Sequence, residues 1–144
     1  MNRLLFFGLG CLVLLGVIGL GWQYFYREGV PTQVSVGEQV YALEVATTDN
    51  ERAVGLGERE SLCSECAMLF LFERPGAYAF WMKGMRFPLD IAWLRDDRIV
   101  HIERRIRSDS TETYQSPIPA NRVLEWNAGA LDGVEVGDRV RFTP

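Results

Sequence analysis

The sequence predicts a mainly β domain, a small barrel or sandwich with one or two short helices, preceded by a transmembrane helix. Short apolar segments, many of them alternating with polar residues, recur at intervals of about eight to twelve residues with turn residues between them, which is typical of such folds. One long apolar run stands ahead of this pattern, and the roughly 115 residues after it suffice for one domain.

The apolar run covers residues 4–22 without a charged side chain, and as a helix it would measure about 28 Å, close to the hydrocarbon thickness of a bilayer. Aromatic residues at 24–26 follow it, as at the interface end of a retained helix. A cleaved signal peptide is the alternative, because Gly19 and Gly21 offer small residues for a cleavage site. We expect residues 1–28 to be the anchor or signal segment, residues 29–39 a linker and first strand, and residues 40–144 the main β domain.

Charge gives the expected orientation and partners. Arg3 precedes the run, whereas Arg27 follows it beside Glu28, so the positive-inside rule leaves the N-terminus in the cytoplasm. We therefore expect a single-pass protein of the inner (cytoplasmic) membrane with an extracytoplasmic, periplasmic C-terminal domain, or a secreted domain after signal cleavage. The net charge is −4 and both signs are interspersed, with no basic stripe, so nucleic acid is not an expected partner.

The first elements of the domain are predicted to be a hairpin and a short helix. Residues 33–36 and 39–46 alternate around Gly37-Glu38, with Tyr41, Leu43 and Val45 on one face. Thr48 and Glu51 fit a capping box for a helix from about residue 49 to 56, with Ala53 and Leu56 facing inward. Gly55 and Gly57 indicate that this helix ends early.

The remaining elements are predicted to be strands and turns. Residues 67–72 form a compact apolar run and residues 78–82 a second one. Residues 89–94 and 98–105 flank Asp96-Asp97 and predict the clearest hairpin. Residues 106–120 are polar and predict a long loop, which in a compact domain is often functional. Strands at 122–127 and 139–142 follow, with one possible helical turn at 129–131.

Five motifs in matching order, from Glu51-Arg52-Ala53 through Val136-Gly137-Asp138-Arg139-Val140, resemble the DUF192 (UPF0127) family. The three motifs between them begin at Met68, Phe80 and Pro88, and Val123-Leu124-Glu125 agrees as well. The resemblance spans roughly residues 40–142. It implies a compact β-rich domain with a short early helix, in a family that is often exported or anchored, and it implies no particular reaction. This chain has Gly57, Ala67 and Gly84-Met85 where the family tends to have Met, Gly and Asn-Thr.

The densest group of chemically mixed residues is Phe80-Trp81-Met82-Lys83 with Asp90, to which Glu125 adds a second carboxylate. An aromatic platform beside a cation and a carboxylate suits a small polar ligand such as a sugar or a peptide terminus. In the alternative, Trp81 is a core residue and Lys83 pairs with Asp90 or Glu125 to fix the turn, since a buried charge needs a partner.

The cysteine pair Cys63 and Cys66 is a disulfide candidate, because disulfides form in exported domains. Free thiols and redox catalysis are the alternatives, and the latter lacks the βαβ setting of thioredoxin-like sites. A soft-metal carrier using Met68, Met82, Met85, His101 and the cysteines is a third possible function. Met68 and His101 have simpler explanations in core packing and hydrogen bonding, so no metal or other cofactor is expected.

Signatures of common hydrolases and phosphate-binding loops are absent from the sequence. A small hydrolase or transferase using Asp90 and Glu125 with Lys83 remains the alternative, and it requires these groups to converge. We expect a membrane-anchored extracytoplasmic binding or envelope-accessory module rather than an enzyme. Its expected partners are the membrane, through the N-terminal helix, and a small polar ligand or an envelope component.

Overall fold

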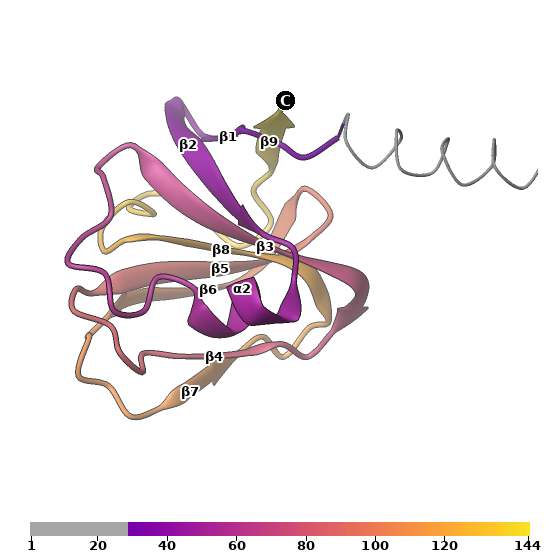
Figure 1. Cartoon of the computed structure of the whole chain (residues 1–144). Coiled ribbons are helices and arrows are strands. Elements are labelled where there is room, and N and C mark those ends of the chain that lie inside the picture. Colours follow the sequence, from indigo (N-terminus) through magenta and orange to yellow (C-terminus); the bar gives the residue numbers. More distant parts are fainter. Residues whose placement is uncertain (1–28) are drawn as a thin grey trace, which may run out of the picture. The chain divides into compact units, whose positions relative to one another are not determined.

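A curled, mostly antiparallel sheet forms the body of the domain in the computed structural model, which describes residues 29–144 (Figure 1). The anchor or signal segment predicted at residues 1–28 lies outside this range. Within residues 29–144 no helix is long and apolar enough to cross a membrane. Residues Pro31–Thr143 form one compact unit.

The first strands confirm the predicted hairpin. β1 (Gln33–Val36) pairs antiparallel with β2 (Gln39–Ala46), and Gly37 takes a φ of 58° at the turn between them. Alternation along β2 places Tyr41 in the core and leaves Val40 more than half exposed. The faces of β2 therefore follow from the sequence pattern.

Helix α2 (Asp49–Val54) begins with the predicted capping box, in which Thr48 Oγ1 accepts from the Glu51 amide and the Glu51 carboxylate accepts from the Thr48 amide. It ends earlier than residue 56, because Gly55 adopts a φ of 52° and its amide donates to the Glu51 carbonyl. The expectation that Ala53 faces inward is wrong, since Ala53 is exposed, whereas Leu56 is buried just beyond the helix.

The central strands are β3 (Cys66–Gly76), β5 (Leu89–Arg95), β6 (Arg98–Ile106) and β8 (Ala120–Asn127). With the first two strands and β9 (Val140–Thr143) they form one sheet in the order β6-β5-β8-β3-β2-β1-β9. β2 and β3 are parallel, and the other neighbours are antiparallel. The predicted hairpin at 89–105 is confirmed as β5 and β6.

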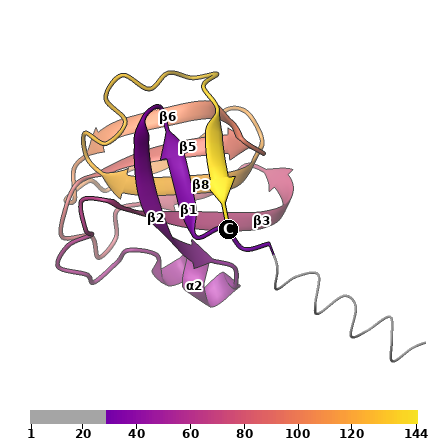
Figure 2. The same cartoon turned by 90° about the horizontal axis from the view of Figure 1, so that it is seen from above.

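The sheet curls until its two edges meet at one end, which gives a half-barrel. Figure 2 shows β1, β2 and β9 lying across β5, β6 and β8. Arg98 at the start of β6 forms a bridge with Arg139 next to β9. The Ile99 amide donates to the Asp138 carbonyl at 2.9 Å, and the Val140 amide donates to the Asp97 carbonyl at 2.8 Å. These bonds join the opposite edges of the sheet.

Each face of the central strands has its own core. The inner core, inside the curl, contains Tyr41, Leu69, Leu94 and Trp126. The outer core lies on the opposite face, beneath α2 and the segments around residues 56–62 and 79–88; among its members are Leu56, Met68, Phe70, Met82, Ile91, Trp93 and Val123. Alternation within each strand divides its side chains between these two cores.

The polar stretch at residues 106–120 was expected to be one long loop, but it contains a short strand. β7 (Thr113–Gln115) lies within it and pairs antiparallel with β4 (Ala79–Trp81), which is shorter than the predicted strand at 78–82. Three-residue strands carry too little alternation to be recognised in a sequence. The two-stranded β4–β7 ribbon lies on the same side of the sheet as α2 in Figure 1.

Candidate functional site

A cavity of about 360 Å³ opens between helix α2 with its following loop and the segment that contains β4. We call it the Glu125 cavity, because the outer face of the sheet contributes Phe70 from β3 and Glu125 from β8 to it. The lining residues are Asp49, Arg52, Ala53, Val54, Gly55, Leu56, Gly57, Phe70, Phe72, Ala77, Tyr78, Ala79, Phe80, Trp81, Lys83, Met85 and Glu125.

Glu125 is a buried acid in a row of apolar neighbours. In the sheet it lies between Met68 of β3 and Ile91 of β5, and only 5% of the residue is exposed. Among residues 29–144 its carboxyl group has no hydrogen-bond or ion-pair partner. Desolvation raises its pKa to about 8, and the positive charge of Arg59 opposes this shift only weakly. At neutral pH the Glu125 carboxyl group is therefore protonated in most molecules.

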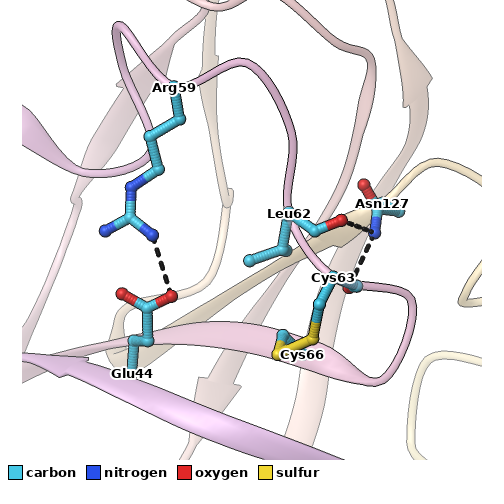
Figure 3. The surroundings of a disulfide bond; sticks show 6 residues. All are labelled: Glu44, Arg59, Leu62, Cys63, Cys66 and Asn127. Atoms are coloured by element: carbon cyan, nitrogen blue, oxygen red, sulfur yellow. Dashed lines mark hydrogen bonds and ion pairs between the residues drawn. A yellow bond between two sulfur atoms is a disulfide. The ribbon is translucent and has the colours of Figure 1, made fainter.

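Arg59 pairs with an acid other than Glu125. Its Nη1 donates to Glu44 Oε1 at 2.8 Å, and both side chains are partly exposed (Figure 3). This pairing lowers the pKa of Glu44, chiefly through the hydrogen bond, and raises the pKa of Arg59. The guanidinium thus acts on Glu125 through space and does not neutralise it by contact.

Aromatic rings form much of the cavity lining. Phe80 packs edge-on against Phe70 of β3 and against Trp93 of β5, with centroid distances of 4.9 and 5.8 Å. Phe72 and Tyr78 stack at 3.5 Å. Because these rings also belong to or contact the outer core, this part of the cavity is a packed wall of fixed shape.

Arg52 attaches helix α2 to the sheet. Its Nη1 donates to the carbonyl oxygens of Thr47 and Leu71, at 2.6 and 2.8 Å, and its Nη2 donates to Asp49 at 2.6 Å. The guanidinium also lies 5.3 Å from the ring centre of Phe72. These contacts occupy Arg52, whereas the Asp49 side chain stays fully exposed beside it.

Two candidates from the motif at 80–83 face the cavity from its rim. Trp81 is 61% exposed, which excludes the alternative in which it is a core residue. Lys83 is exposed and, within the part of the chain that the structure describes, forms no ion pair, so it pairs with neither Asp90 nor Glu125. Met82, by contrast, is 2% exposed and belongs to the outer core. The fold thus brings together four of the predicted residues at the cavity: Phe80, Trp81, Lys83 and Glu125. Met82 does not line the cavity and packs in the outer core.

Asp90 is not part of this group, because it lies on the opposite face of the sheet. It pairs with Trp126, an inner-core residue, whereas the next position along β5, Ile91, pairs with Glu125. Asp90 is fully buried, and its two oxygens accept from the backbone amides of Arg105 at 2.7 Å, Gly129 at 2.9 Å and Leu131 at 3.0 Å. The convergence of Asp90 with Glu125 and Lys83 that a hydrolase or transferase would require is absent from the described residues.

The loop between α2 and β3 is held beside the cavity by a disulfide and an amide. Cys63 and Cys66 are joined, with their Cα atoms 5.2 Å apart. The Asn127 side chain, two positions after Glu125 on β8, donates to the carbonyl oxygens of Leu62 and Cys63 at 3.1 and 3.0 Å (Figure 3). Leu62 itself is buried in the outer core. These contacts anchor the loop that carries Arg59.

Replacing both cysteines, as Cys63→Ser with Cys66→Ser, is expected to lower the free energy of unfolding by about 2 kcal/mol, because a loop of four residues loses little entropy when it is closed. Urea unfolding followed by tryptophan fluorescence measures the change. Reduction of the wild-type protein should give the same decrease and leave the double variant unaffected. A reductant effect of equal size on both proteins would contradict this assignment.

The residues proposed for a soft-metal site have other contacts. The Cys63 and Cys66 sulfurs are bonded to each other, and His101 Nε2 contacts Glu103 at 2.9 Å. Met68 is a buried core residue. Among residues 29–144 no three His, Cys, Asp or Glu side chains are grouped so as to hold a metal ion.

Sequence reasoning missed several residues of the site. Arg52 stands in a motif that carries the family resemblance, yet its role in attaching α2 depends on a carbonyl of β3, which no local pattern reveals. Phe70 reads as a core residue and does belong to the outer core, although it also lines the cavity. Glu125, by contrast, was among the predicted residues, as an acid between the apolar residues Leu124 and Trp126.

The model of the DUF192 family, described as an uncharacterised protein group, matches residues 32–142. A crystal structure of a protein of unknown function from Novosphingobium aromaticivorans is 33% identical, with a TM-score of 0.71, over 78% of this chain and 84% of that one. A second, from Sinorhizobium meliloti, whose description suggests a transcription regulator, is 28% identical, with a TM-score of 0.71, over 76% and 90%. No curated protein matches the chain.

Proposed function

This chain belongs to the DUF192 family, and from that premise we propose that it is a membrane-anchored extracytoplasmic module that binds a small polar ligand in the Glu125 cavity. Phe80, Trp81, Lys83 and Glu125 are the proposed binding residues. Met82 and Asp90 are proposed to support the site structurally. The comparisons supply no activity, so the proposal is based on the chemistry of the cavity.

The observation that carries the proposal is the isolated carboxyl group of Glu125 in the cavity. Among residues 29–144 the fully buried side-chain polar atom that lacks a partner is Trp126 Nε1, so the Glu125 carboxyl group keeps access to the cavity that it lines. A carboxyl group that opens on a cavity and forms no hydrogen bond or ion pair within residues 29–144 is available to a ligand. A ligand that reaches the carboxyl group would supply the missing interaction.

The rest of the cavity suits a ligand of moderate size. Its volume of about 360 Å³ falls within the usual range for small-molecule sites, roughly 300–1,000 Å³. Aromatic rings on the wall offer apolar contact, while Lys83 and Glu125 offer polar groups at different depths, since one is exposed and the other buried. Trp81 gives an exposed indole at the rim for stacking.

The extracytoplasmic location is supported by two independent features. Residues 4–22 form an apolar run long enough to span a bilayer. The Cys63–Cys66 disulfide suits an oxidising compartment, because cytosolic thiols are normally kept reduced. An enzyme using Asp90 and Glu125 is not favoured, since their side chains point to opposite faces of the sheet.

A ligand screen with paired variants tests the proposal. The full chain in detergent micelles is screened by thermal shift against sugars, free amino acids and short peptides, and the hits are measured by calorimetry. Trp81→Ala combined with Lys83→Ala is expected to weaken binding of a hit on the order of 10- to 100-fold, because it removes an aromatic contact and the free cation.

The matched control combines Val136→Ala with Arg141→Ala, which likewise removes an exposed apolar side chain and an exposed cation, but outside the cavity. It should bind as the wild type does. Equal affinity of wild type and the Trp81/Lys83 variant for every hit would place binding elsewhere. The absence of any hit among the three compound classes would contradict the proposal as a whole.

A further inference from the structure

We infer that the ligand of the Glu125 cavity carries a primary ammonium group, as an amino acid or a peptide N-terminus does, and that this group pairs with the Glu125 carboxylate. The inference rests on the proposed function and names the class of ligand.

Four ionisable side chains line the cavity, and two of them pair with each other. Asp49 and Arg52 form an ion pair of 2.6 Å at helix α2. Lys83 and Glu125 are left, and within residues 29–144 neither has an ion-pair partner. A complementary ligand therefore presents a positive group to the buried acid and a negative or acceptor group to the exposed cation.

The surroundings of Glu125 favour a cation over a neutral hydrogen-bonding group. Aromatic rings such as Phe80 line the cavity and offer apolar contact beside the ammonium group. Once it is deprotonated, the Glu125 carboxylate forms a charge-assisted hydrogen bond with an ammonium group, which is about twice as strong as a neutral hydrogen bond. This gain has to exceed the cost of removing the proton from a group whose pKa is about 8. Burial of the carboxyl is part of the folded structure, so the ligand does not have to desolvate it.

Several charged groups surround Glu125, and each has a partner or lies away from it. On β2 and the loop after α2, Glu44 and Arg59 pair with each other. On β6, Glu103 shares the outer face but contacts His101. The residues of β3 and β5 directly beside Glu125 are Met68 and Ile91, which carry no charge. An ammonium group is thus the partner that the site lacks.

The rim suggests how the rest of the ligand lies. Val54 from α2 and Trp81 from β4 are both cavity-lining and more than half exposed, so they offer apolar contact at the entrance. Lys83 follows β4 and is exposed at the same side of the cavity. A short apolar amino acid or peptide would place its ammonium at Glu125, its side chain against these residues and its carboxylate or carbonyl oxygen near Lys83.

Binding of this kind moves one proton in a defined direction. The carboxyl group of Glu125 is mostly protonated at pH 7, whereas the carboxylate pairs with the ligand's ammonium. Its proton therefore leaves to the buffer when the ion pair forms, and no covalent bond changes. Calorimetry in two buffers of different ionisation enthalpy should find a net release of protons on binding, because the folded protein without ligand holds the proton of Glu125.

Three dipeptides serve as probes for the full chain in detergent micelles. L-leucyl-L-leucine has both charged ends, its N-acetyl derivative lacks the ammonium, and its C-terminal amide lacks the carboxylate. We expect acetylation to weaken binding on the order of 100-fold and amidation on the order of 10-fold, since the buried contact is worth more than the exposed one. Free L-leucine and a protein with an accessible N-terminal leucine distinguish the two sources of the ammonium group.

Single variants test whether Glu125 is the carboxyl group that releases the proton and pairs with the ammonium. Glu125→Gln should abolish both the proton release and the preference for the free ammonium. Glu103→Gln, a matched change on the same face outside the cavity, should leave both as in the wild type. Thermal unfolding verifies that each variant is folded. A Glu125→Gln protein that retains the proton release would overturn the inference.

The remaining outcomes separate the inference from the proposed function. If neutral sugars bind in the cavity and every dipeptide fails, the ligand class is wrong while the binding module stands. If the acetylated dipeptide binds as tightly as the free one, the ammonium is not recognised and the inference fails. If no compound of any class binds, both fail together.

Discussion

Asp90→Ala is expected to destabilise the domain by about 4 kcal/mol, a large part of the 5–15 kcal/mol that typically stabilises a domain of this kind. The fully buried carboxylate of Asp90 accepts three backbone amide hydrogen bonds, one from Arg105 on β6 and two from the turn after β8. Alanine leaves those amides without acceptors, at about 1–3 kcal/mol for each that stays buried.

The same hydrogen bonds explain an unusual backbone conformation. Arg105 is not a glycine, yet it has a φ of 50°, next to the irregularity where β6 pairs with the start of β5. Its amide points to Asp90 Oδ1 in this conformation. Without the acceptor the strained residue loses its support, so local order at the end of β6 should decrease along with global stability.

Urea unfolding measures the decrease in the free energy of unfolding of Asp90→Ala. Two further variants test whether the lost hydrogen bonds cause this decrease. Asp90→Asn keeps one acceptor oxygen and should lose about half as much as the alanine variant. Asp132→Ala is the matched control, because it removes an exposed carboxylate that pairs with the Arg105 side chain at 2.6 Å; it should cost less than about 1 kcal/mol. Equal stability of the Asp90→Ala and Asp132→Ala proteins would contradict this role for Asp90.

The second large effect is a pH dependence of stability that Glu125→Gln removes. The pKa of Glu125 is raised by burial from 4.5 to about 8. Between these two values the folded protein holds a proton that the unfolded chain has released, so stability falls as the pH rises from about 4.5 to about 8. The full difference is on the order of 5 kcal/mol, at about 1.4 kcal/mol for each pH unit.

Glutamine has nearly the same shape and stays neutral, so Glu125→Gln should be more stable than the wild type at pH 8 and similar to it at pH 5. Other groups act outside this window, since the lowered pKa values of Glu44, Glu51 and Asp109 place their effects at more acidic pH. Unfolding midpoints of both proteins at each pH unit from 5 to 9 give the comparison. A constant difference between the two proteins over that range would show that Glu125 does not titrate there.

Local patterns in the sequence predicted the local parts of the fold. The turn at Gly37-Glu38, the Thr48–Glu51 capping box and the hairpin around Asp96-Asp97 are each encoded within a few residues. The parallel pairing of β2 with β3, the insertion of β8 between β3 and β5, and the pairing of β4 with β7 depend on segments far apart in the chain. No periodicity in one segment specifies such partners.

The same distinction applies to the site. Trp81 and Lys83 could be recognised from their unusual neighbourhood in the sequence, and both line the cavity. Asp90 was grouped with them because it is close in the chain and charged. Its side chain points to the inner core, since the register between β5 and β8 decides which of two adjacent positions faces the cavity. A shift of one residue in that register would exchange the roles of Asp90 and Ile91.

A direct titration of the Glu125 side chain tests most sharply whether the cavity contains a desolvated and unpaired acid. The δ-carbon resonance of Glu125 in ¹³C-glutamate-labelled full-length protein is assigned by its absence from the Glu125→Gln spectrum and followed from pH 3 to pH 10. Burial predicts a midpoint near pH 8 in the protein without ligand. A midpoint near the ordinary value of 4.5 would mean that water or a cation already contacts this carboxyl group, and the cavity would then lack the group on which ligand binding is proposed to depend.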